Sequence, residues 1–341
     1  MGFSALWIWM FHTWKLLWLP GILRWVEIYT VRTGYYGVDC FFLLSGFGLS
    51  FSLSKEPNLR HFYWKRAKKI YPPFIIIGVY HCVKYHFGVL DLLKWISCFS
   101  FYTHSIYDLL WYIPAQITLY VFFPLLFKLL DRSGDSTALV MLFLGIWFLL
   151  SIIFRTTSRI DLYGFSNRIP DFLIGTWYGH TLYKNHIILS RVAWFLIAFS
   201  FLLGLYLGYL TNFSKFWSDI PASANRVPSS LISSTIVLLI PAILEAGLQH
   251  PITHYVVLGV QRILSFYGKI SLEFYCFQYD VMLIIQSFTT QFPTLLSNMI
   301  LLLAQTSVAL LAHYFIEWCW TGMSVVYTFI KPFFICTTTH L

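Results

Sequence analysis

Residues 36–53 read YGVDCFFLLSGFGLSFSL, and Asp39 is the only charged side chain among them. A helix of about 20 apolar residues crosses the hydrocarbon core of a bilayer. Backbone polar groups in hydrocarbon must bond to one another, and this stretch lacks the apolar–polar alternation of a barrel strand. The stretch therefore predicts a membrane-spanning α-helix.

Apolar stretches of this kind recur along the whole chain of 341 residues. Hydrophobic residues make up 58% of the sequence and charged residues 11%, with a mean hydropathy of +0.69. A soluble domain carries about 25% charged residues. So few charges would leave large apolar patches on a water-facing surface, which soluble proteins avoid. The composition excludes a soluble protein.

The apolar stretches predict an all-α integral membrane protein with about ten transmembrane helices in one bundle. A single transmembrane domain is expected over residues 1–335, followed by a short tail, 336–341. The segment 88–108 is less apolar and is expected to form a loop or a shallow helix. The predicted spans are 1–18, 36–53, 70–87, 110–130, 137–154, 168–184, 192–210, 229–248, 266–288 and 296–318.

The charge pattern predicts how the chain is oriented. Basic residues concentrate between the second and third spans, against the single acid Glu56; such loops face the cytoplasm. The net charge of +9 is therefore explained by loops at the inner membrane surface, and a nucleic-acid partner is not expected. The basic residues of this loop are Lys55, Arg60, Lys65, Arg66, Lys68 and Lys69.

Two polar residues are candidates for acid–base chemistry. His12 lies in the first span and Asp39 opens the second, so both are expected in the outer half of the bilayer. Polar groups within spans are costly and are functional candidates for that reason. A carboxylate beside an imidazole fixes its tautomer and raises its basicity, as a general base requires. The alternatives are a packing histidine and a helix N-cap aspartate.

Arg66 and Lys69 are three residues apart, so they share one face of a helix and can bind phosphoryl oxygens together. The alternative is a basic anchor at the cytoplasmic leaflet. Glu273, Gln278 and Asp280 are the polar residues of the ninth span. For Glu273, a helix-end ion pair with Lys269 is as good an interpretation as a site. The six cysteines lack metal-ligand spacing and predict packing residues, without disulfides or a metal.

Five segments, in order, resemble the acyltransferase-three family of membrane O-acyltransferases. They are GYYGVDCFFLLSGF (34–47), FYWKRAKKIYP (62–72), LWYI (110–113) with Tyr120 and Pro124, NRIPDFLIG (167–175) and YGKISLEFY (267–275). The resemblance extends over nearly the whole chain. The first motif alone is moderately specific, and five in the same order are a strong match.

The resemblance implies an enzyme that moves an acyl group, usually acetyl, from cytoplasmic acyl-CoA to a hydroxyl of a glycan or lipid-linked saccharide. It implies His12 as general base with Asp39 orienting it, and Arg66 and Lys69 as the residues that bind the donor phosphates. Acetyl-CoA is then a co-substrate, and no cofactor or metal is expected to be bound. Residues expected to contact the acceptor or support the site are Arg168, Trp111, Tyr112 and Glu273. The expected location is a bacterial inner (cytoplasmic) membrane.

Three positions depart from the family pattern. Members commonly carry an arginine eleven residues before the histidine, a glutamate in the fourth span and a histidine ending the ninth-span motif. Here those positions are Met1, Gln116 and Gln278. The two glutamines keep hydrogen bonding and lose titration. A family member that has lost catalysis is thus one alternative. A transporter or flippase is another, although the paired repeats typical of transporters are not evident.

Overall fold

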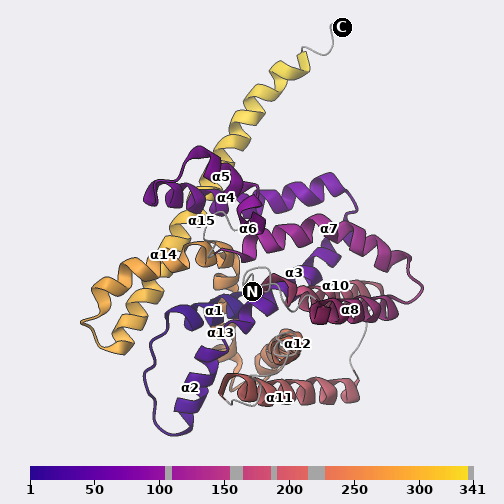
Figure 1. Cartoon of the computed structure of the whole chain (residues 1–341), viewed down its shortest axis with the longest axis vertical. Helices are drawn as coiled ribbons and strands as arrows, with labels where there is room; N and C mark the ends of the chain where they lie inside the picture. The colour runs from indigo at the N-terminus through magenta and orange to yellow at the C-terminus, as the bar shows by residue number, and fades with distance from the viewer. Residues whose placement is uncertain (104–109, 154–163, 186–189, 214–226, 337–341) are drawn as a thin grey trace.

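The computed structural model describes residues 1–103, 110–153, 164–185, 190–213 and 227–336, and all elements within them are helices (Figure 1). Their bounds are α1 Gly2–Thr13, α2 Ile22–Arg32, α3 Tyr36–Lys55, α4 Leu59–Lys84, α5 Val89–Ile96, α6 Phe99–Thr103, α7 Tyr112–Arg132, α8 Ser136–Ile153, α10 Ile169–Asn185, α11 Arg191–Phe213, α12 Val227–Gln249, α13 His254–Lys269, α14 Ser271–Thr289 and α15 Thr294–Cys336.

Helix α3 is the central element, because α1, α7, α10 and α12 all pack on it. In the most apolar 18-residue stretch of α3, 67% of the residues are buried. The core around it is aromatic and contains fully buried phenylalanines from six helices, with Phe101 contributed by the short helix α6 and the other five by longer helices. These are Phe42 of α3, Phe74 of α4, Phe123 of α7, Phe172 of α10 and Phe274 of α14.

Helices α3 and α10 pack so closely that glycines of each helix lie against the backbone of the other. A Cβ atom at Gly175 would overlap the backbone oxygen of Leu43, and one at Gly46 would overlap that of Phe172. Between membrane helices small residues allow this close approach, which supplies van der Waals packing in place of a hydrophobic driving force. The glycines of two motifs far apart in sequence therefore fix this helix pair.

Within the described ranges, five helices are long and apolar enough to cross a membrane: Tyr36–Lys55, Tyr112–Arg132, Arg191–Phe213, Val227–Gln249 and the Thr294–Gly322 part of α15. A shorter apolar helix covers Ser136–Leu150. These helices agree with the expected class of membrane protein. The expected count of ten spans is not confirmed and stays a prediction.

Several helix boundaries differ from the predicted ones. The first span was expected over 1–18, but α1 ends at Thr13 and an extended segment follows. The predicted span 266–288 is divided at Ile270, where α13 ends and α14 begins. Helix α2 was not predicted, because its 11 residues are amphipathic and too short to span.

Two helices are longer than expected. Helix α4 runs without interruption from the basic loop through Pro72 and Pro73. Between α4 and α7, the segment 88–108, which was expected to be a loop or a shallow helix, contains the short helices α5 and α6. Helix α15 continues to Cys336, and its C-terminal part projects beyond the other helices (Figure 1). Most of the predicted tail, 337–341, lies outside the described residues.

Candidate functional site

A small polar cavity lies where α1, α3, α4, α7 and α14 meet, with a volume of about 80 Å³. We call it the polar cavity. Its apolar walls come from Met1, Phe41, Ile70 and Leu272. Its hydrogen-bonding side chains are Ser45, Lys69, Tyr112, Gln116, Tyr120, Ser271 and Tyr275. So many polar groups in one small space within an apolar bundle indicate a site, since each costs free energy unless it is paired.

Gln116 organises one wall of the polar cavity. Its amide nitrogen Nε2 donates to the hydroxyl of Ser45 at 2.7 Å and to that of Tyr120 at 2.6 Å. Because both hydroxyls accept from the amide, each keeps its own O–H to donate elsewhere. The Ser45 hydroxyl is also hydrogen-bonded to those of Tyr120 and Tyr112, so the wall offers a connected set of hydroxyls to a carbonyl oxygen. The sequence singled out Gln116 only as a departure from the family pattern.

The two predicted phosphate ligands lie at this cavity and beside it. Lys69 lines the cavity directly. Arg66, one turn earlier on α4, has its guanidinium 4.9 Å from the ring centroid of Phe62 and lies near Tyr120. Burial lowers the pKa of Arg66, and the nearby Tyr120 raises it. Arg66 and Lys69 thus place two cations at the α4 side of the cavity.

His12 lies at the opposite end of α1 from the polar cavity. Its side chain is exposed, and its ring packs edge-on against Phe11 with centroids 4.9 Å apart. Met1 lines the polar cavity, so eleven residues of α1 separate it from His12, about 16 Å along the helix axis. His12 is not among the residues that line the polar cavity.

Asp39 is placed against Arg168. Arg168 Nε lies 2.9 Å from Asp39 Oδ1, and both side chains are almost fully buried. Helix α1 runs antiparallel to α3 and to the residues just before it, so that Gly34 lies beside Phe11 and Gly37 beside Ser4. Residues after Gly37 therefore lie progressively farther from His12. The expected orientation of His12 by Asp39 finds no support in this register, and the carboxylate neutralises an arginine instead.

Arg168 also contacts residues outside α3. Its Nη1 donates to the backbone oxygen of Gly164 at 2.7 Å, and its guanidinium lies over the ring of Trp111 at 5.0 Å. Asp171 lies near enough to interact electrostatically with both Arg168 and Asp39. Asp171 in turn accepts hydrogen bonds from the hydroxyls of Ser233 at 2.6 Å and Ser230 at 3.1 Å. The predicted residues Arg168 and Trp111 thus belong to a buried polar cluster, separate from the residues that line the polar cavity.

The acids of the ninth span pair with basic side chains from other helices. Asp280 lies 2.7 Å from His81 Nε2 and 2.8 Å from Lys84 Nζ, both on α4. Glu273 lies 3.0 Å from His313 Nδ1 on α15. The alternative of a helix-end pair with Lys269 is not among the contacts of the described residues. Sequence spacing contains no signal for these pairs, because their partners lie 40 to 199 positions away.

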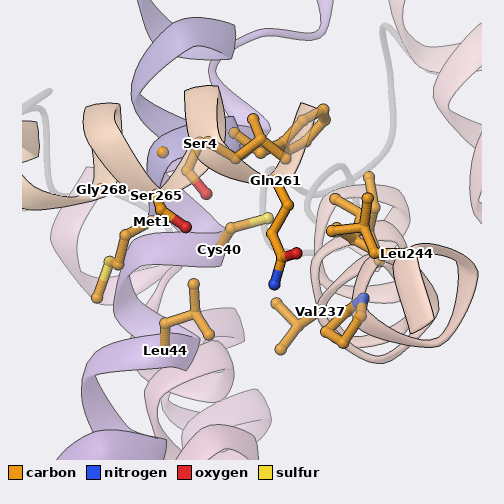
Figure 2. A pocket seen from close by; sticks show the side chains of 15 residues that line it. Met1, Ser4, Cys40, Leu44, Val237, Leu244, Gln261, Ser265 and Gly268 are labelled. Atoms are coloured by element: carbon orange, nitrogen blue, oxygen red, sulfur yellow. The ribbon is translucent and has the colours of Figure 1, made fainter. Parts of the chain in front are cut away.

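A second cavity, of about 320 Å³, lies between α1, α3, α12 and α13, and we call it the apolar cavity (Figure 2). Most of its lining is hydrophobic, including Leu44, Val237 and Leu244. The sulfur of Cys40 and the amide of Gln261 point into it (Figure 2). Met1 lines both cavities.

Within the part of the chain that the structure describes, no three histidine, cysteine, aspartate or glutamate side chains come together as a metal site would require.

Comparison with protein families gives one assignment for the chain. The family described as an acyltransferase domain, of the acyltransferase-three type, matches residues 2–329. Neither the curated proteins nor the solved structures contain a significant match. The family match covers every residue of both cavities except Met1, together with the Asp39–Arg168 pair.

Proposed function

The chain belongs to the acyltransferase-three family, and on that premise we propose that it is a membrane O-acyltransferase. The reaction moves an acyl group, acetyl in the simplest case, from acyl-CoA to a hydroxyl of a glycan or lipid-linked saccharide. The single observation that carries the proposal is the polar cavity, in which oriented hydroxyls stand next to a lysine within an apolar bundle. A bacterial inner membrane is the proposed location.

In the proposed arrangement the donor enters from the α4 side. Arg66 and Lys69 bind its phosphates, since guanidinium and ammonium groups form charge-assisted hydrogen bonds to phosphoryl oxygens. The thioester carbonyl then lies in the polar cavity. The hydroxyls of Ser45 and Tyr120, held by Gln116, donate to the carbonyl oxygen as it gains negative charge.

The proposed reaction is an acyl transfer by attack of the acceptor hydroxyl on the thioester carbonyl. His12 accepts the proton of the acceptor hydroxyl as its oxygen attacks the thioester carbonyl. The tetrahedral intermediate collapses with cleavage of the C–S bond, and the CoA thiolate takes up a proton. Because His12 lies about 16 Å along α1 from Met1 and a general base must be within hydrogen-bond reach of the hydroxyl, α1 must move and bring His12 to the polar cavity before this proton transfer.

A second candidate is a family member that binds the acyl donor without transferring its acyl group. The observation that favours it is the exposed side chain of His12 at the far end of α1 from the polar cavity. Both candidates use the same donor site, so donor binding alone does not distinguish them. Acyl transfer does.

The test compares the purified full-length protein with His12→Ala and His61→Ala. His61 is an exposed histidine outside both cavities and serves as the matched control. With labelled acetyl-CoA and membrane glycolipid acceptors, we expect His12→Ala to slow transfer about 10²- to 10⁴-fold, the range for general acid–base catalysis. Undiminished transfer in His12→Ala removes His12 from the mechanism. Binding of acetyl-CoA without any transfer by the wild type favours the second candidate.

A further inference from the structure

The two cavities are neighbours that share one wall. On α3, Cys40 and Leu44 line the apolar cavity, while the residues that follow each of them, Phe41 and Ser45, line the polar cavity. Met1 borders both. A methionine side chain is unbranched and flexible, so its movement can open one space to the other. The cavities are therefore adjacent, with Met1 between them.

The two cavities differ in size and in lining, so they suit different parts of a substrate. The polar cavity, at about 80 Å³, has room for little more than the carbonyl end of a substrate. The apolar cavity, at about 320 Å³, reaches the lower end of the range of ligand pockets. A saccharide placed there would leave hydroxyls unpaired against Leu44, Val237 and Leu244, at a cost in free energy. A hydrocarbon chain has no polar groups of its own that would need partners there.

We propose that the apolar cavity holds the hydrocarbon chain of the acyl donor, so that the preferred donor is an acyl-CoA longer than acetyl-CoA. This inference rests on the proposed function, because it takes the thioester carbonyl to lie in the polar cavity. From there the chain passes Met1 and lies between α3 and α12, against Leu44 and Val237 (Figure 2).

The test measures how affinity depends on chain length. Labelled acetyl-CoA bound to the purified full-length protein is displaced by unlabelled acetyl-, butanoyl-, hexanoyl- and octanoyl-CoA. We expect the affinity of the wild type to rise by up to about fourfold for each added methylene, the equivalent of the ~0.8 kcal/mol of one buried CH₂, until the cavity is full.

Two variants fill the cavity from different helices. Val237→Phe fills it from α12 and Ser265→Phe fills it from α13, so a folding failure in one leaves the other. The control is Ile243→Phe, which adds an aromatic ring to α12 at a position 64% exposed and outside the lining. Longer acyl chains also partition into detergent, and this effect is the same for the Ile243→Phe control and the filled variants. We expect the ratio of octanoyl- to acetyl-CoA affinity to fall at least tenfold in the filled variants relative to the control.

The outcomes separate the inference from the function on which it rests. If acetyl-CoA binds and affinity does not rise with chain length, the inference is overturned and the proposed donor site stands. The same holds if affinity rises equally in the filled variants and the control, because the chain then lies elsewhere. If no acyl-CoA binds to the folded protein, both proposals fail.

Discussion

Arg168 Nε lies 2.9 Å from Asp39 Oδ1 in the interior of the helix bundle, with the two side chains only 4% and 1% exposed. The pair joins α3 to the start of α10, the two helices that the Gly46 and Gly175 contacts hold together. In a low-dielectric interior such a pair is costly to form and much more costly to break. Asp39 therefore has a structural role, as the partner of a buried arginine and not as the helix N-cap that the sequence offered as an alternative.

Asp39→Asn should destabilise the protein strongly, because it removes the carboxylate that pairs with the buried Arg168 charge. Loss of one member of a buried pair costs about 3–5 kcal/mol. The free energy of unfolding can be measured by SDS titration of the purified protein. Glu245→Gln, at an exposed acid of α12, is the control. The double variant Asp39→Leu/Arg168→Met should lose less than Asp39→Asn alone. Equal stability of Asp39→Asn and the control would contradict this account.

Asp280→Asn should loosen the contact between α4 and α14. The carboxylate holds His81 and Lys84 at 2.7 and 2.8 Å, and the Lys84 side chain is 30% exposed, so solvent can satisfy part of what is lost. We expect a loss of about 1–3 kcal/mol in the free energy of unfolding. Hydrogen exchange should rise in α14 relative to α11, with which no such contact is lost. Unchanged exchange in α14 would show that the pair does not hold these helices.

Gln116→Leu should impair acyl-CoA use more than stability. The change removes the donor that orients Ser45 and Tyr120, so their O–H groups no longer point to the substrate carbonyl. A lost hydrogen-bond donor at such a site costs about 2.7–4 kcal/mol of transition-state stabilisation, or about 10²-fold in rate or more. Steady-state transfer should show this loss in kcat. A fully active Gln116→Leu would exclude this role.

Glu27→Gln should weaken the segment between α1 and α2 in a pH-dependent way. The Glu27 carboxylate accepts from Leu17 N at 2.7 Å, Trp14 Nε1 at 3.1 Å and Leu19 N at 3.4 Å. Burial alone would raise the pKa of Glu27, but these bonds together hold it below the ordinary 4.5. The stabilisation is therefore full above about pH 4.5 and is lost as the pH falls through the folded-state pKa. Thermal unfolding should show a wild-type advantage at neutral pH that shrinks in acid. An advantage independent of pH would contradict the assignment.

The sequence predicted the class of fold well, because membrane insertion depends on local composition. The predicted span 36–53 agrees with α3, and 110–130 agrees with α7. The predicted helix boundaries were wrong where hydropathy does not determine them. The break at Ile270 falls within an apolar stretch that hydropathy alone treats as continuous, and α2 is too short and amphipathic to register as a span.

The site was only partly predictable. Lys69 and Tyr112 do line one cavity, but the partners of Asp39, Glu273 and Asp280 lie on helices far away in sequence. Spacing reports which side chains share a face of one helix and contains no information on which helices meet. The roles of His12, Arg66 and Lys69 in binding and catalysis stay predictions.

The most direct test of the donor site is the affinity of the purified protein for labelled acetyl-CoA in Lys69→Gln and Arg66→Gln, compared with Lys65→Gln. Lys65 is on the same helix, exposed and outside the cavity lining, so it removes the same charge without touching the site. We predict that Lys69→Gln and Arg66→Gln each weaken binding about tenfold, the effect of losing a charge-assisted hydrogen bond of about 1.5 kcal/mol, whereas Lys65→Gln binds as the wild type does. Equal affinity in all three variants would contradict a donor site at the polar cavity.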